Sequence, residues 1–157
     1  MIKEFLNLYN TLVNLSRNKS LFSIFTDKDT FSDRLLILLF HFAFFLRQHK
    51  VKTDKEYLQK FFDYFFRQIE LSIREIGYGD ASINKKMKDY INVFFSILDK
   101  INDWNNLDNV KKGEILGFYY DLKDNHLKIV NYFNNFEVYL SKTSLKSFTM
   151  GVLKHKF

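Results

Sequence analysis

Residues 53–80, TDKEYLQKFFDYFFRQIELSIREIGYGD, show most clearly how this chain folds. Their apolar side chains recur every three or four residues, which predicts one long helix with a single buried face. That stripe consists of Leu58, Phe62, Phe65, Ile69, Ile73 and Ile76. Thr53 and Glu56 have capping-box spacing at its start, and Glu70 and Arg74 lie one turn apart as an ion pair. Gly77 predicts its end, because glycine readily takes the left-handed conformation.

The same periodicity predicts helices on both sides of this one. Four further helices are expected over Lys3–Arg17, Ser32–Gln48, Val110–Tyr120 and Asp124–Ser141. Another begins after Asp80 or Ser82, either of which can cap it, and reaches Ile101. The inward-facing side chains expected on these helices are Phe5, Leu8, Tyr9, Leu12, Leu15, Ile83, Met87, Tyr90, Ile91, Phe94, Leu98, Ile101, Leu127, Val130, Phe133, Phe136 and Leu140.

The segments between these helices are read as connections. Thr30 and Asp33 have capping-box-like spacing before the second helix. The stretch Asn18–Asp29 carries Leu21, Phe22, Ile24 and Phe25, which indicates a packed loop or a short turn of helix. A polar connection, Asn102–Asn109, contains the single tryptophan, Trp104, and the tail from Thr143 to Phe157 is expected to add a final turn or two.

Composition points to an all-α chain. The 157 residues include no proline, five glycines, nineteen phenylalanines and nine tyrosines, so helix breakers are scarce. No internal repeat or linker is visible. We therefore expect residues 1–157 to form one domain, an irregular antiparallel bundle of about six helices.

The longest apolar run, Leu35–Leu46, is apolar all round, which predicts a helix buried among the others. It is also too short to cross a bilayer, which takes about 20 residues. The start of the chain, which includes Glu4, does not have the pattern of a secretory signal.

Several kinds of chemistry lack the residues they need. Without cysteine the chain cannot build disulfides, thiolate zinc sites or a cysteine nucleophile. The histidines are not paired at helical spacing, so we expect no metal, no cofactor and no enzyme. His41 lies in the apolar run and is predicted to be a core residue bonded to a backbone carbonyl. The other three, His49, His126 and His155, are predicted to lie on the surface.

The Gly77-Tyr78-Gly79 sequence does not follow a strand, so it lacks the context of a phosphate loop. Glu75 and Asp80 flank it. Their structural interpretation, in which Asp80 caps the next helix and Glu75 forms a local ion pair, is preferred over acid–base catalysis.

Charge favours anionic partners. The formal net charge is +6 and the pI is near 9.3, which suits a phosphate backbone, ribosomal RNA or an anionic membrane. Lys85, Lys86 and Lys88 place positive charge at the start of a helix, where the dipole opposes it, so they form either a binding surface or a solvated basic face. A second basic set lies in the tail among apolar residues that are taken to be exposed, and suits a membrane, a partner helix or a frayed terminus. This tail set comprises Lys142, Lys146, Lys154 and Lys156, with Phe148, Met150, Leu153 and Phe157.

One segment resembles a known family. Residues Arg74–Asp80, followed by Ser82-Ile83 and Lys85-Lys86-Met87-Lys88, are similar to the signature of the ubiquinol–cytochrome c chaperone family. In that family a helix ends in an Arg-Glu-Met-Gly-Val-Gly-Asp type run, and a Ser-Val-Pro-Lys type turn opens a basic helix. Weaker similarity extends over the two preceding helices. This chain departs at Asn84, where the family tends to have proline, and at Tyr78, where it has a smaller aliphatic residue.

The resemblance implies a non-catalytic assembly chaperone for ubiquinol–cytochrome c reductase that binds newly made cytochrome b. It also implies partners near the ribosomal exit, including a small partner protein, and no DNA. The family resemblance and the charge pattern together single out Arg74, Glu75, Tyr78, Asp80, Lys85, Lys86 and Lys88 as client- or partner-binding residues, with Gly77, Gly79 and Ser82 shaping the turn. The expected location is the bacterial cytoplasm beside the inner membrane, or the mitochondrial matrix in a eukaryote. The alternative is a membrane-surface or RNA-binding helical module that has no cytochrome client.

Overall fold

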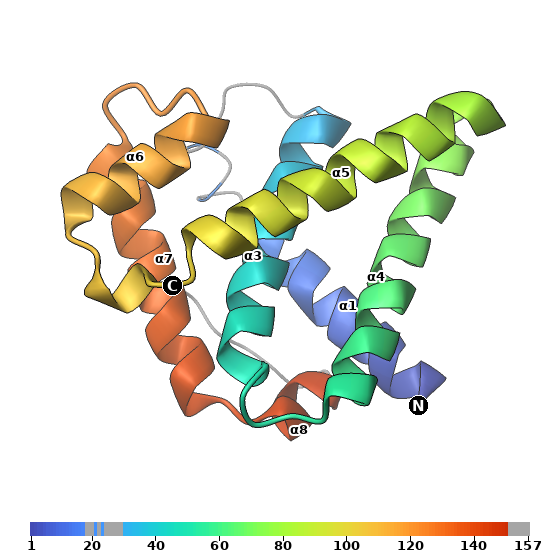
Figure 1. The fold of residues 1–157 in the computed structure, drawn as a ribbon, viewed down its shortest axis with the longest axis horizontal. Helices are drawn as coiled ribbons and strands as arrows, with labels where there is room; N and C mark the ends of the chain where they lie inside the picture. Colours follow the sequence, from blue (N-terminus) through green and yellow to red (C-terminus); the bar gives the residue numbers. More distant parts are fainter. Residues whose placement is uncertain (18–20, 22, 24–29, 151–157) are drawn as a thin grey trace.

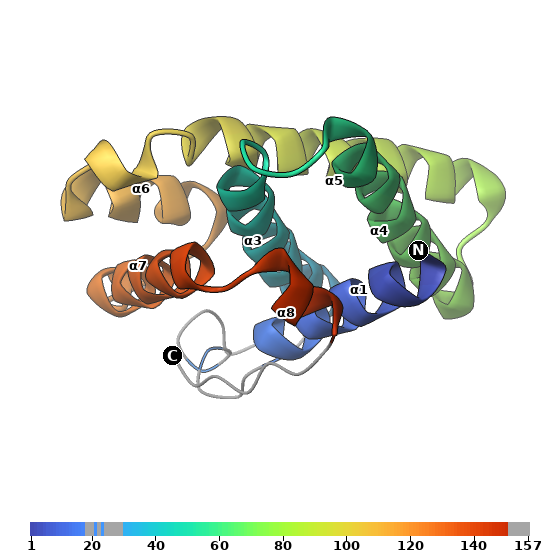
Figure 2. The ribbon, with the colours of Figure 1, turned by 90° about the horizontal axis from the view of Figure 1, so that it is seen from below.

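The structure is a computed structural model that describes residues 1–17, 21, 23 and 30–150. All regular secondary structure in these residues is helical, which confirms the all-α prediction (Figures 1 and 2). The elements are α1 (Ile2–Ser16), α3 (Phe31–His49), α4 (Lys55–Ile76), α5 (Asp80–Lys100), the 3₁₀ turn η1 (Trp104–Asn106), α6 (Asn109–Tyr119), α7 (His126–Lys142) and α8 (Leu145–Thr149). The bundle is irregular, and within the described ranges none of its helices is long and apolar enough to cross a membrane.

Helix α3 lies at the centre of the bundle, between α1 and α5 on one side and α7 on another (Figures 1 and 2). Every residue from Ile37 to Phe45 is buried, as the all-round apolar pattern predicts. Thr30 caps its start by accepting a hydrogen bond from the backbone N–H of Asp33 at 3.2 Å. The predicted Thr30–Asp33 cap is therefore confirmed.

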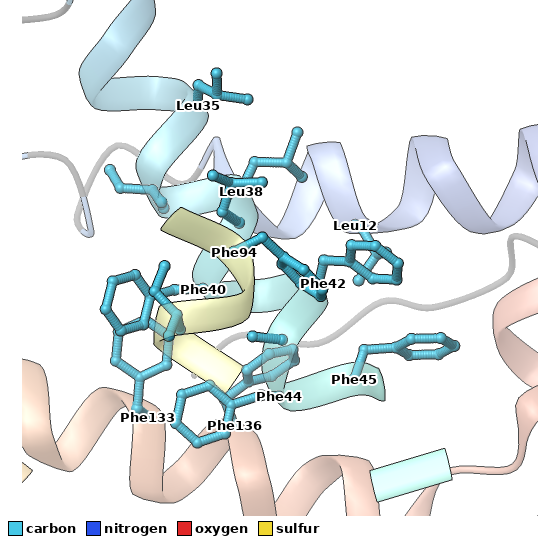
Figure 3. Packing of buried hydrophobic residues seen from close by; sticks show 14 of the residues in the cluster. Leu12, Leu35, Leu38, Phe40, Phe42, Phe44, Phe45, Phe94, Phe133 and Phe136 are labelled. Atoms are coloured by element: carbon cyan, nitrogen blue, oxygen red, sulfur yellow. The ribbon is translucent and has the colours of Figure 1, made fainter. Parts of the chain in front are cut away.

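Aromatic side chains on α3 tie two halves of the core together (Figure 3). Phe42 stacks on Phe65 of α4 and on Phe94 of α5, with ring centroids 4.0 and 4.9 Å apart. Two residues further on, Phe44 stacks on Phe133 of α7 at 5.0 Å and meets Trp104 edge-on at 5.0 Å. One helix thus organises both the α1–α4–α5 side and the α7 side.

His41 is a fully buried core residue, as predicted. Its Nδ1 lies 2.7 Å from the Ile37 carbonyl oxygen, which can only accept, so Nδ1 donates. Nε2 is then the acceptor for the Tyr132 hydroxyl at 2.6 Å. Burial lowers the pKa of His41 to about 4, so the ring stays neutral at physiological pH.

The start of α4 differs from the prediction. Its N-cap is Asp54, whose side chain accepts from the Glu56 backbone N–H at 3.4 Å, so the Thr53 cap is wrong. Asp54 is also a preferred N-cap residue, and its carboxylate accepts from a free N–H group at the start of the helix. The buried stripe also includes Phe61 and Phe66, which belong to neighbouring rows of the same face.

Four predicted exposures are wrong, one of them at Ile76, which is described with the site below. His49 and Phe148 are buried, whereas Leu127, expected inside, is 60% exposed. The reason for the first two is α8, which returns to the bundle: Phe148 packs edge-on against Phe45 at 5.2 Å and against His49 at 6.0 Å. Leu127 lies in the first turn of α7, before that helix reaches the core.

The chain segments outside the helices follow the predictions in part. Leu21 is buried, whereas Phe22, Ile24 and Phe25 lie outside the described residues, as does the tail beyond Met150. Trp104, in the polar connection after α5, is buried, and its indole N–H donates to the Asn134 side chain at 3.0 Å.

Candidate functional site

The predicted site forms the α4–α5 corner, defined here as residues 74–88. Helix α4 ends at Ile76, and Gly77 follows with φ +105° while its N–H donates to the Arg74 carbonyl at 3.0 Å. An L side chain is strained at that φ, so the prediction that Gly77 ends the helix in a left-handed conformation is confirmed. Gly79 has φ −74° and ψ 161°, which other residues adopt freely.

A charged brace spans the corner. The Arg74 guanidinium lies 2.6 Å from Asp80 Oδ1 on α5 and 3.4 Å from Glu70 Oε1, one turn earlier on α4. Glu70 also pairs with Arg67. The hydrogen bond that Arg74 donates to Asp80 raises the pKa of Arg74, and the hydrogen bond that Glu70 accepts from Arg67 lowers the pKa of Glu70. The predicted Glu70–Arg74 pair and the Arg74–Asp80 contact are both present.

Asp80 does not cap α5. It is the first residue of α5, the N-cap is Gly79, and no side chain caps this helix. The prediction that Asp80 or Ser82 caps α5 is wrong, because the Asp80 carboxylate turns back to Arg74 across the corner. Ser82 lies exposed in the first turn of α5.

The aromatic ring and the lysines of the corner face solvent. Tyr78 is 44% exposed, and the Lys86 ammonium lies 4.5 Å from the centroid of its ring, in cation–π geometry. Lys85 and Lys88 are exposed, and Lys86 is partly buried. Within the described ranges, none of the three lysines forms an ion pair. These cations are therefore available to an anionic partner.

Glu75 points to a different part of the surface. It is exposed and makes no ion pair with the residues that the structure describes, so the predicted local salt bridge is not found there. Instead it lines a groove of about 510 Å³ between α1, α3 and α4, beside Ser72 and Ile76. The structure thus brings Arg74 together with Asp80, and Tyr78 with Lys86, but sets Glu75 apart.

Ile76 is the residue of this site that sequence reasoning misplaced. As the last member of the α4 stripe it was expected to be buried, yet it is 52% exposed. Its position provides the signal: it is the last helical residue before Gly77, beyond the part of α4 that packs on the bundle. The corner therefore offers apolar contacts as well as charges.

The corner is chemically suited to binding. Its acids and bases are solvent-exposed, and its brace holds them in fixed positions. Within the described residues there is no group of three or more side chains that could hold a metal ion. Burial lowers the pKa of both His41 and His49 to about 4, and neither belongs to the corner; His41 is enclosed in the core with both ring nitrogens hydrogen-bonded.

Comparison with known proteins agrees with this geometry. The family model described as ubiquinol-cytochrome C chaperone matches residues 23–103, which is just over half of the 157 residues. This chain belongs to the ubiquinol-cytochrome C chaperone family. The matched segment includes α3, α4, α5 and the whole corner, and it ends before α6.

A solved structure shares the fold. The crystal structure of the Cbp3 homolog from Brucella abortus superposes with a TM-score of 0.73 at 23% sequence identity. The match covers 98% of this chain and 89% of that one, so the likeness extends to α6, α7 and α8, beyond the segment that the family model matches. No curated protein matches the sequence.

Proposed function

We propose that this protein binds newly made cytochrome b and holds it during assembly of ubiquinol–cytochrome c reductase. Membership of the chaperone family supports a role in assembling that complex, which implies a client protein. Cytochrome b is the client that we propose, and the protein acts on it by binding and not by catalysis. Its proposed location is the bacterial cytoplasm beside the inner membrane, or the mitochondrial matrix if the source is a eukaryote.

The observation that carries this proposal is the α4–α5 corner inside the segment that matches the family. Gly77 and the Arg74–Asp80 brace fix its backbone, and fixed exposed groups lose little conformational entropy when a partner binds. The proposed contacts to client or partner are Arg74, Glu75, Tyr78, Asp80, Lys85, Lys86 and Lys88. Among them, Tyr78 and the three lysines present the charge and aromatic surface, whereas Arg74 and Asp80 also hold the turn.

The brace and the lysines have different roles in this proposal. Loss of Arg74 or Asp80 loosens the corner, whereas loss of a lysine removes a contact and leaves the turn intact. A small partner protein and the ribosomal exit region are further proposed contacts. Both fit the positive charge of the corner, because ribosomal RNA and acidic proteins are attracted to unpaired lysines.

Deletion of the gene tests the function directly. We expect the reduced-minus-oxidised spectrum of membranes from the deletion strain to lose b-type haem absorbance, together with assembled reductase. An unchanged spectrum and unchanged complex content would refute the proposed function.

Complementation then tests the corner. A variant carrying Lys85→Gln, Lys86→Gln and Lys88→Gln should restore less complex than the parent gene. A control variant with Lys55→Gln, Lys111→Gln and Lys128→Gln removes the same charge from exposed lysines at the start of α4, on α6 and on α7, all away from the corner. Equal restoration by both variants would refute the role of the corner lysines.

A further inference from the structure

The tip of the α4–α5 corner exposes two apolar side chains, one of which, Ile76, also lines the edge of the groove between α1, α3 and α4. Ile76 and Tyr78 flank Gly77 and are 52% and 44% exposed. The apolar residues that precede Ile76 on the same face of α4, such as Ile69 and Ile73, are almost completely buried. The tip lies where two long helices meet, at the opposite end of the molecule from α6 and α7 (Figure 1).

Positive charge surrounds this tip. Lys86 lies against the Tyr78 ring, and Lys85 and Lys88 are exposed on the next turns of α5. Of the acids in the corner, Asp80 is neutralised by Arg74, while Glu75 lies in the groove beside α1 and α3. Asp89, which follows Lys88, is also exposed. The groups left over are thus two apolar side chains and three lysines beside one acid. That mixture is typical of surfaces that bind the interface of an anionic membrane.

We propose that the corner docks this protein on an anionic bilayer, with Ile76 and Tyr78 in the interfacial region and Lys85, Lys86 and Lys88 over the lipid headgroups. The left-handed turn at Gly77 holds the two apolar side chains at the tip without any rearrangement. A tyrosine suits this position, because its ring is apolar and its hydroxyl stays in contact with water.

The apolar pair is what favours a lipid surface over RNA. RNA engages lysines through its phosphates and tyrosine through base stacking, so Ile76 is the member of the pair that separates the two partners, because it gains nothing from phosphates. A bilayer uses both kinds of group. The inference goes beyond the proposed function and does not depend on it: vesicle binding needs no client, so either can fail without the other.

Vesicle co-sedimentation of the purified chain tests the charge component. Each lysine near an anionic surface contributes about fivefold to binding, so the triple Lys→Gln variant at 85, 86 and 88 should bind phosphatidylglycerol vesicles about 100-fold more weakly. The control triple at 55, 111 and 128 should bind within a few-fold of the parent. Binding of the parent should fall as salt increases and should be weak on phosphatidylcholine.

Two further variants test the apolar component. Ile76→Ser and Tyr78→Ser should each weaken vesicle binding several-fold, and Ile76→Ser should leave binding to a single-stranded RNA probe unchanged. If both bind vesicles as tightly as the parent, Ile76 and Tyr78 do not enter the bilayer and the proposal is wrong. Equal losses in the corner and control triples, or binding of RNA alone, would also overturn it.

Tryptophan fluorescence reports whether the tip of the corner enters the bilayer. Trp104 is 1% exposed, so its emission forms a constant background in the parent protein. In the Tyr78→Trp variant, we expect a blue shift on adding phosphatidylglycerol vesicles and quenching by brominated lipids. If the added signal neither shifts nor is quenched while the protein co-sediments, the tip stays in water and the proposed orientation is refuted.

Discussion

Replacing Gly77 and Gly79 by serine, one at a time, tests whether the corner requires glycine at each position. We expect that Gly77 is required and that Gly79 is not. A residue other than glycine in the left-handed conformation lowers the free energy of unfolding by about 1–2 kcal/mol. Replacing glycine also makes the unfolded chain less flexible, which offsets about 0.4–1 kcal/mol of that loss. Gly77 has φ +105°, so Gly77→Ser should lower the free energy of unfolding by about 1 kcal/mol. For a chain of this length that shifts Tm down by about 2–4 °C.

Gly79 provides the matched control. Its φ and ψ lie in the extended region, an added Cβ would meet no atom within 4 Å, and serine is a preferred N-cap. Gly79→Ser should therefore raise the free energy of unfolding by about 0.5–1 kcal/mol. Urea unfolding of the two variants and the parent measures both effects. If Gly77→Ser is as stable as the parent, or if Gly79→Ser is the less stable variant, the turn geometry described here is wrong.

Three other changes test the fold. The folded-state pKa of His41, about 4, lies below the value of 6.5 for the unfolded chain, so the unfolded state binds more protons between these values. His41 should contribute roughly 3 kcal/mol to the fall in the free energy of unfolding as pH decreases from 6.5 to 4, and His41→Gln should remove that part in urea titrations, while buried His49 keeps its own contribution. Thr30→Ala should cost about 1 kcal/mol and Thr53→Ala less than about 0.5 kcal/mol, because only Thr30 caps a helix; equal losses in thermal unfolding would contradict this. Asn134→Ala removes the acceptor of the Trp104 indole N–H and should cost roughly 1–3 kcal/mol, seen as an earlier transition in tryptophan emission.

The helices were largely predictable because their apolar spacing is strong. The buried centre of α3 follows from its all-round apolar run, and α4 ends at Gly77 as expected. The errors lie where a local pattern has two solutions. Thr53 and Asp54 are adjacent, and both residue types can cap a helix. The spacing of Thr53 and Glu56 favoured Thr53 as the cap, whereas the N-cap in the structure is Asp54. Phe148 was misplaced because its burial depends on α8 returning to α3, a contact across about a hundred residues.

The sequence predicted which residues belong to the site better than it predicted their contacts and exposure. Its residues were found because the segment resembles a family signature, and the turn at Gly77 follows from glycine's backbone freedom. Asp80 was expected to cap the next helix, because aspartate is a preferred N-cap residue. Only a structure shows that the carboxylate turns back to Arg74 and that Ile76 is left exposed.

Crosslinking during synthesis of cytochrome b tests the central claim most directly. A photo-crosslinking amino acid at position 86, in the corner, should capture cytochrome b as it is made, and the same group at position 128, on α7, should capture much less. Both positions carry lysine in the parent chain, so the substitutions are matched in charge. A cytochrome b adduct specific to position 86 is the predicted result. Equal adducts at both positions, or none at position 86 in cells that still assemble the reductase, would contradict the account.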